Sequence, residues 1–295
     1  MSLDLNHVVT ERRRVAPLLL TVLALLAGPV LAEKRDAFRV CADPNNLPFS
    51  NQAREGFENR LAELLAEDLG LPVAYTWFPQ RMGFIRNTLR AKDPDRDGYR
   101  CDVVMGVPAG YELAVTTQPY YRSTYALVYV KGRGLDDIQS GTDLINLDPA
   151  RKQALRVGVF ERTPAAQWLA KHGDFAATKS YVTMSGDPAA YPGEIVEKEL
   201  VSGKIDAAIL WGPIAGYFAS RAKDVEMRVI PLQTEPGIRF DFAISAGVRF
   251  GDGDWKKEIQ DALDRQADAI KALLQEYSVP LVSEDGSVSA DTAAP

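Results

Sequence analysis

The chain has 295 residues, of which 46% are apolar and 25% charged, and its formal net charge is −6. This is the composition of a soluble globular protein with room for two hydrophobic cores, and the acidic balance argues against nucleic-acid binding. The only histidines are His7 and His172. This scarcity argues against Ser-His and Cys-His catalytic arrangements and against histidine-rich metal sites.

Residues 1–32 have the features of a secretory signal peptide. Three arginines at residues 12–14 precede an apolar run at 15–28, and small residues lead up to Ala32. We therefore expect export and cleavage after Ala32. The alternative is an uncleaved membrane anchor, although the apolar run is short for a membrane span.

The segment 38–51 begins as a short apolar strand and breaks into a loop rich in proline and asparagine. After Gly56-Phe57-Glu58, apolar residues at helical spacing follow from Leu61, and Gly70 marks the end of that helix. Ligands of open α/β sheets bind beyond the carboxyl ends of strands. We therefore expect the loop at residues 43–51 to form one wall of a binding site.

Strands and helices continue to alternate through the first half of the chain. We expect strands at 71–77, 101–107 and 124–131, with a helix at 82–90. The order β-α-β-α-β is typical of a mostly parallel sheet with crossover helices.

The second half repeats this alternation without repeating the sequence. The expected strands are 156–160, 180–184, 204–210, 225–232 and 240–248, and the expected helices are 164–172, 194–201, 214–221 and 255–277. Thr163 followed by Pro164 is a typical helix start.

The predicted fold class is α/β with two lobes, each a mostly parallel sheet flanked by helices. One lobe would comprise residues 36–122 plus 241–282, and the other residues 123–240. The chain would cross between them twice, which makes a double-stranded hinge with a ligand cleft between the lobes. Residues 283–295 are small and polar, and we expect a disordered tail.

The opening segment resembles a known family. Residues 41–51 read CADPNNLPFSN and are followed by Gly56-Phe57-Glu58. This pattern resembles the start of periplasmic type II solute-binding proteins, and in particular the branch encoded with PQQ-dependent (quinoprotein) alcohol and methanol dehydrogenases. The resemblance covers nearly all of residues 38–281. It implies a periplasmic, non-catalytic protein with the two-lobed type II fold.

Amino-acid-binding members of this family hold their ligand with two charged residues. An arginine precedes the Pro-Tyr-Tyr stretch, and an aspartate follows the Asp-Ala-Ala-Ile strand. Here the first region, residues 110–113, contains no arginine, and the second position is Trp211. A free α-amino acid would leave its charges poorly paired, so we expect a different ligand.

Aromatic and cationic side chains take their place at strand ends and loops. Our candidates for ligand binding are Asp43, Asn45, Phe49, Trp77, Arg81, Tyr121, Arg122, Arg162, Thr163 and Trp211. Aromatic faces stack on planar ligands, arginines pair with carboxylates, and the helix start at Thr163 favours an anion. A planar polycarboxylate such as PQQ suits these residue types. It also suits the resemblance, because members of this branch are encoded with PQQ-dependent dehydrogenases. For the aromatic residues the alternative is packing between lobes.

Cys41 and Cys101 are the only cysteines. In an oxidising compartment such a pair is typical of a disulfide, with two buried thiols as the alternative. Cys41 lies near the end of its expected strand and Cys101 at the start of its own. This difference in position argues against the close approach that a disulfide requires.

Asp93, Asp95, Asp97 and Gly98 resemble the opening of a calcium loop. The twelfth position is Val104, within a predicted strand, which excludes an EF-hand. We favour a solvated turn and predict no metal site.

Three functions remain open. The first is a non-catalytic binding protein that closes around a ligand or binds a quinoprotein dehydrogenase. The second is the substrate-binding component of an ABC transporter, with a permease as partner. The third is a dehydratase-like enzyme on the same fold, for which the candidate acids and bases are Asp43, Glu112, Glu161 and Glu194. We favour the first, with no cofactor of its own and PQQ only as a bound ligand.

Overall fold

The structure is a computed structural model that describes residues 35–288, apart from residues 174, 184, 186 and 188. The predicted signal peptide and residues 289–295 lie outside the described residues. Residues 283–288, for which we expected no regular structure, form a turn that a bridge between Val282 and Val288 closes.

The amino-terminal strands and the last strand form one half of the sheet. These strands are β1 (Phe38–Ala42), β4 (Val73–Trp77), β5 (Val103–Pro108), β6 (Val115–Thr116) and β12 (Asp241–Val248). β4, β1 and β5 are parallel neighbours, and β12 pairs antiparallel with β5 and β6. The helices of this half are α1 (Phe57–Asp68), α2 (Phe84–Asn87), α7 (Gly253–Arg265) and α8 (Ala267–Glu276). A short hairpin of β2 (Asn45–Asn46) and β3 (Ser50–Asn51) follows β1.

The middle of the chain forms the other half. Its strands are β7 (Tyr121–Val130), β8 (Val157–Phe160), β9 (Lys179–Tyr181), β10 (Ala207–Trp211) and β11 (Met227–Pro231). β10, β8 and β9 are parallel neighbours, whereas β7 is antiparallel to both β10 and β11. Its helices are α3 (Gly141–Ile145), α4 (Pro149–Ala154), α5 (Pro164–His172), the π-helix η1 (Ile195–Leu200) and α6 (Gly212–Arg221).

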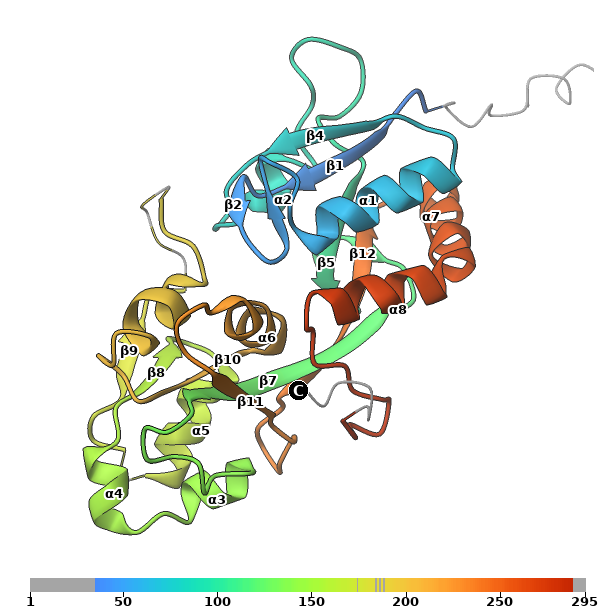
Figure 1. The fold of residues 1–295 in the computed structure, drawn as a ribbon. Coiled ribbons are helices and arrows are strands. Elements are labelled where there is room, and N and C mark those ends of the chain that lie inside the picture. Colours follow the sequence, from blue (N-terminus) through green and yellow to red (C-terminus); the bar gives the residue numbers. More distant parts are fainter. Residues whose placement is uncertain (1–34, 174, 184, 186, 188, 289–295) are drawn as a thin grey trace, which may run out of the picture. The chain divides into compact units, whose positions relative to one another are not determined.

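The long strand β7 belongs to both halves, as its course in Figure 1 shows. Residues 121–124 pair with β12, whereas residues 125–130 pair with β10 and β11. All the strands apart from β2 and β3 are therefore connected in one hydrogen-bonded network, and β7 and β12 supply the two predicted crossings. The lobe boundaries that we drew from the sequence stay a prediction.

A third segment runs beside these two strands. Ser123 and Leu281 form a β-bridge, the Ser123 hydroxyl donates to Pro280 O at 2.7 Å, and Val282 N donates to Arg122 O at 3.1 Å. The residues after α8 therefore brace the crossing, which the sequence pattern did not indicate.

Helix α6 packs closely against this bracing segment through two glycines one turn apart. A Cβ built on Gly216 would lie 1.9 Å from Ser278 O, and one on Gly212 would lie 2.3 Å from Thr124 O and 2.6 Å from Pro280 Cγ. The contacting atoms are mostly backbone, so they cannot move aside as a flexible side chain would.

Gly216→Ala is therefore expected to destabilise the protein by about 1–3 kcal/mol, although alanine favours a helix by about 1 kcal/mol. Urea unfolding measures this loss. Gly253→Ala is the matched control, because a Cβ at Gly253 meets nothing within 4 Å at the start of α7. An alanine at Gly216 that leaves stability unchanged or raised would contradict the close contact.

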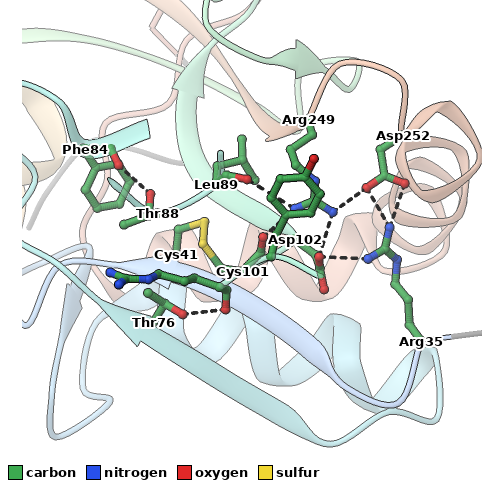
Figure 2. Close-up of a disulfide and its surroundings, with 12 residues drawn as sticks. Arg35, Cys41, Thr76, Phe84, Thr88, Leu89, Cys101, Asp102, Arg249 and Asp252 are labelled. Atoms are coloured by element: carbon green, nitrogen blue, oxygen red, sulfur yellow. Dashed lines mark hydrogen bonds and ion pairs between the residues drawn. A yellow bond between two sulfur atoms is a disulfide. The ribbon is translucent and has the colours of Figure 1, made fainter. Parts of the chain in front are cut away.

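The predicted disulfide between Cys41 and Cys101 is present, with a Cα–Cα distance of 5.4 Å. The strand register places Val104, not Cys101, opposite Cys41. Cys101 reaches Cys41 because it lies in the irregular segment just before β5, where Asp102 N donates to Arg39 O at 2.8 Å. Figure 2 shows this disulfide beside a cluster of arginines and aspartates.

Candidate ligand-binding cleft

A cavity of about 310 Å³, here called the cleft cavity, lies beyond the carboxyl ends of β1, β8 and β10. One side is lined by residues that follow β1 and β4, among them Asp43, Asn45, Phe49, Gln80 and Arg81. The other side is lined by residues of the middle of the chain, among them Tyr125, Phe160, Thr163, Tyr191 and Trp211. Its volume lies at the lower end of the range for small-molecule sites.

Asp43 joins the two loops on the first side of the cleft cavity. Its Oδ1 accepts from Asn45 N at 2.8 Å and its Oδ2 accepts from Gln80 N at 2.5 Å. A second bond joins the same loops, from Asn46 Nδ2 to Gln80 Oε1 at 2.9 Å. Both carboxylate oxygens of Asp43 thus accept backbone N–H groups, and the residue shapes this wall.

Asn45 reaches from this wall to the opposite side. Its Nδ2 donates to Ala189 O at 3.2 Å, and the neighbouring Ala190 and Tyr191 line the cleft cavity. The described structure therefore has the two sides in direct contact at one edge of the cavity.

Aromatic residues that support one another form the second side. The ring centroids of Trp211 and Tyr125 lie 5.5 Å apart, and Phe242 packs behind both at 5.9 and 6.5 Å. Burial raises the pKa of Tyr125 to about 12, so its hydroxyl stays neutral. A planar ligand would meet a preorganised apolar surface here.

Thr163 begins α5 at the cleft cavity, as its sequence context predicts. Its hydroxyl accepts from Ala166 N at 3.4 Å and donates to Phe160 O at 2.7 Å, and Pro164 follows as the first helical residue. The side chain is engaged by its own helix, so its part in the cavity is to fix the end of β8 and the start of α5.

Six of the ten candidate residues line the cleft cavity: Asp43, Asn45, Phe49, Arg81, Thr163 and Trp211. Their binding role stays a prediction, but the structure does bring them together from distant parts of the chain.

The other four candidates lie outside the lining of the cleft cavity in this structure, and their binding role also stays a prediction. Trp77 stacks on Tyr75 at 4.6 Å along β4. Tyr121 is only 7% exposed and belongs to the core. Arg122 forms an ion pair with Asp241 at 2.6 Å where β7 and β12 pair, and Arg162 is exposed in a left-handed turn with φ 59°.

Several lining residues were not among our candidates. Phe160 ends β8, and the strand-end rule that identified Asp43 could have identified it as well. Gln80 has a similar position after β4. Tyr125 lies inside β7 and Tyr191 in an irregular segment, and neither has a local sequence signal.

The carboxylates nominated for catalysis do not gather in the cleft cavity. Only Asp43 lines it. Glu112 is exposed in a loop, Glu194 pairs with Lys198 at 2.8 Å, and Glu161 accepts from Thr183 Oγ1 through its backbone carbonyl at 2.6 Å.

The aspartate-rich segment before β5 forms a turn. Asp93 pairs with Arg96 at 2.9 Å, and its Oδ1 accepts from Asp95 N at 3.0 Å. Among the described residues, no three side chains of histidine, cysteine, aspartate or glutamate are grouped so as to hold a metal ion. In the same part of the chain, no helix has the length and apolar character needed to cross a membrane.

Comparison with known proteins identifies the family. No family model matches the chain. It is 30% identical to protein MoxJ of Methylorubrum extorquens, over 93% of this chain and 98% of that protein. The chain belongs to the MoxJ family of type II periplasmic solute-binding proteins.

Further relatives support this assignment. Protein MoxJ of Paracoccus denitrificans is 28% identical over 87% of this chain and 93% of that protein. The crystal structure of the periplasmic binding protein XoxJ from Methylobacterium extorquens AM1 aligns with a TM-score of 0.66 and 35% identity, and covers 84% of this chain and 100% of that one. The predicted two-lobed fold of this MoxJ-family protein is thereby confirmed, and XoxJ is described as a periplasmic binding protein.

Proposed function

We propose that this chain is a non-catalytic periplasmic binding protein of a PQQ-dependent methanol or alcohol dehydrogenase system, and that its cleft cavity binds a planar organic anion such as PQQ. Its similarity to the MoxJ proteins supports the first part. Export by the signal peptide at residues 1–32 belongs to the same proposal.

The observation that carries the ligand class is the lining of the cleft cavity. Trp211 and Tyr125 form an aromatic wall, and Asp43 and Arg81 are the charged side chains among the lining residues. Asp43 is itself an anion, so Arg81 is the charged lining residue whose guanidinium would pair with a ligand's carboxylate.

The same lining disfavours an amino acid. Trp211 stands where amino-acid-binding relatives have an aspartate, so an ammonium group would lose its partner there. An uptake role for a transporter stays the alternative, with a non-amino-acid organic solute as ligand. A pull-down from periplasm distinguishes the two: a quinoprotein dehydrogenase as partner supports our proposal, and a permease supports the alternative.

The ligand is tested by titrating PQQ into the purified protein, followed by tryptophan fluorescence and calorimetry. We expect saturable binding, and we expect Trp211→Ala to weaken it by about 2 kcal/mol, roughly thirtyfold, through loss of the stacked ring. Trp77→Ala is the matched control, because Trp77 is also a partly buried strand residue but lies outside the cleft cavity. Absence of any PQQ-dependent signal in the unmodified protein would refute this ligand.

A further inference from the structure

One part of the cleft-cavity lining belongs to no helix or strand. Three consecutive residues, Ala190, Tyr191 and Pro192, line the cavity, and they lie in the irregular segment just before the π-helix η1. Backbone of this kind has no ladder of hydrogen bonds to fix its course. The position of this part of the wall therefore depends on the side-chain contacts that hold it.

Tyr191 itself makes the principal contact of this kind. Its hydroxyl donates to Glu197 Oε2 at 2.5 Å, and Glu197 lies in the first turn of η1, six positions further along the chain. A hydroxyl that donates to a carboxylate forms a short and strong hydrogen bond. The bond therefore ties the lining segment 190–192 to the helix that follows it.

Further contacts hold the same ring. The ring centroids of Tyr191 and Phe218 of α6 lie 6.1 Å apart, and the Nζ atom of Lys198 lies 5.6 Å from the centroid of the Tyr191 ring. Phe218 also covers Gly193, where a Cβ would stand 2.1 Å from Phe218 Cζ. The Tyr191 ring is thus packed between η1 and α6, and its hydroxyl is directed to Glu197.

Glu197 has no evident task apart from this bond. Its side chain is exposed, and it is not among the residues that line the cleft cavity. Within the described part of the chain, its carboxylate has no hydrogen-bond partner other than Tyr191.

We propose that Glu197 is a positioning residue of the cleft cavity: it holds the Tyr191 hydroxyl and thereby fixes the lining segment 190–192, without touching the ligand. A wall that is fixed before binding loses less conformational entropy when the ligand binds, so the affinity is higher. The inference rests on the proposed function, since it concerns the same cavity and the same class of ligand.

The first test measures the affinity for PQQ in the unmodified protein, in Glu197→Ala, in Tyr191→Phe and in the double variant. Each single substitution removes the hydrogen bond and leaves the aromatic ring in place, so we expect each to weaken binding about fivefold. The double variant should bind no more weakly than either single variant, because both changes remove the same bond. Glu197→Gln keeps an acceptor oxygen and should restore most of the affinity. Losses that add up in the double variant would contradict the proposal, since Glu197 would then act by another route.

Tyr181→Phe is the matched control. The Tyr181 hydroxyl donates to Glu199 Oε2 at 3.1 Å, in the same π-helix, but Tyr181 does not line the cleft cavity. Removing this hydroxyl breaks the same kind of bond to the same helix and should leave the affinity for PQQ unchanged. An equal loss in Tyr181→Phe and Tyr191→Phe would assign the effect to η1 as a whole and overturn the role of Glu197.

The second test needs no ligand. Glu194 N donates to Tyr191 O at 3.3 Å, so hydrogen exchange in peptides covering residues 189–196 reports whether the segment is held. Exchange should be severalfold faster in Glu197→Ala than in the unmodified protein or in Tyr181→Phe. Unchanged exchange in Glu197→Ala would show that the bond does not fix the segment.

The two tests separate the two claims. If PQQ binds none of the proteins, the proposed ligand is wrong and the ligand half of this inference is overturned with it, whereas the exchange rates still decide whether Glu197 holds the segment. If PQQ binds and exchange is faster in Glu197→Ala but the affinity does not fall, Glu197 is not a positioning residue for the ligand.

Discussion

Replacing both Cys41 and Cys101 with alanine is expected to lower the free energy of unfolding by about 4 kcal/mol, because the disulfide closes a long loop and restricts the unfolded chain. The two cysteines are separated by 60 positions in the sequence. Both are buried, at 3% and 0% exposure, so alanine remains compatible with the site. For a chain of this size we expect the melting temperature to fall by roughly 10 °C.

The same measurement under reducing conditions supplies the control. A reductant should lower the melting temperature of the unmodified protein toward that of the double variant, and should leave the variant itself unchanged. If the unmodified protein and the double variant melt together under oxidising conditions, the disulfide contributes no stability and the loop-closure argument fails.

Asp102→Asn is expected to destabilise the protein by about 3 kcal/mol, because it removes one of the two carboxylates that balance two partly buried arginines. Asp102 is 5% exposed, and its Oδ1 pairs with Arg35 at 2.9 Å and with Arg249 at 2.8 Å. Asp252 pairs with the same two arginines, as Figure 2 shows. Asparagine keeps the shape of the side chain but not its charge, so Arg35 and Arg249 would share Asp252 alone.

Urea unfolding of Asp102→Asn measures the loss, and Asp137→Asn is the matched control. Asp137 also pairs with an arginine, Arg151, at 2.8 Å, but both side chains are exposed. Solvent screens such a pair, so the control should change stability little. Equal effects of the two substitutions would show that burial does not strengthen the cluster around Asp102.

The alternation of strands and helices could be predicted from the sequence because periodicity and turn residues are local signals. The prediction of one continuous helix at 255–277 was wrong, because the structure has two helices in this segment. The segment is broken at Gln266 into α7 and α8, and the Gln266 side chain donates to Asp68 Oδ1 at 2.8 Å. That contact joins residues far apart in the chain, so no local pattern indicates it.

The candidate site was predictable only in part, because a position at a strand end does not tell where the side chain points. Asp43 and Trp211 follow or end strands and line the cleft cavity. Trp77 also ends a strand, yet it stacks on Tyr75. Tyr121 begins a strand and enters the core against Phe57, with ring centroids 6.2 Å apart. Register and packing separate these cases.

By itself, the sequence determined the two-lobed α/β fold and the pair of cysteines, because each depends on residue type and order along the chain. Only the tertiary structure decided which side chains meet in the cleft cavity and that residues 280–282 brace the crossing. These depend on contacts between segments distant in sequence, and the free energy of such contacts is set by burial and packing rather than by local conformation.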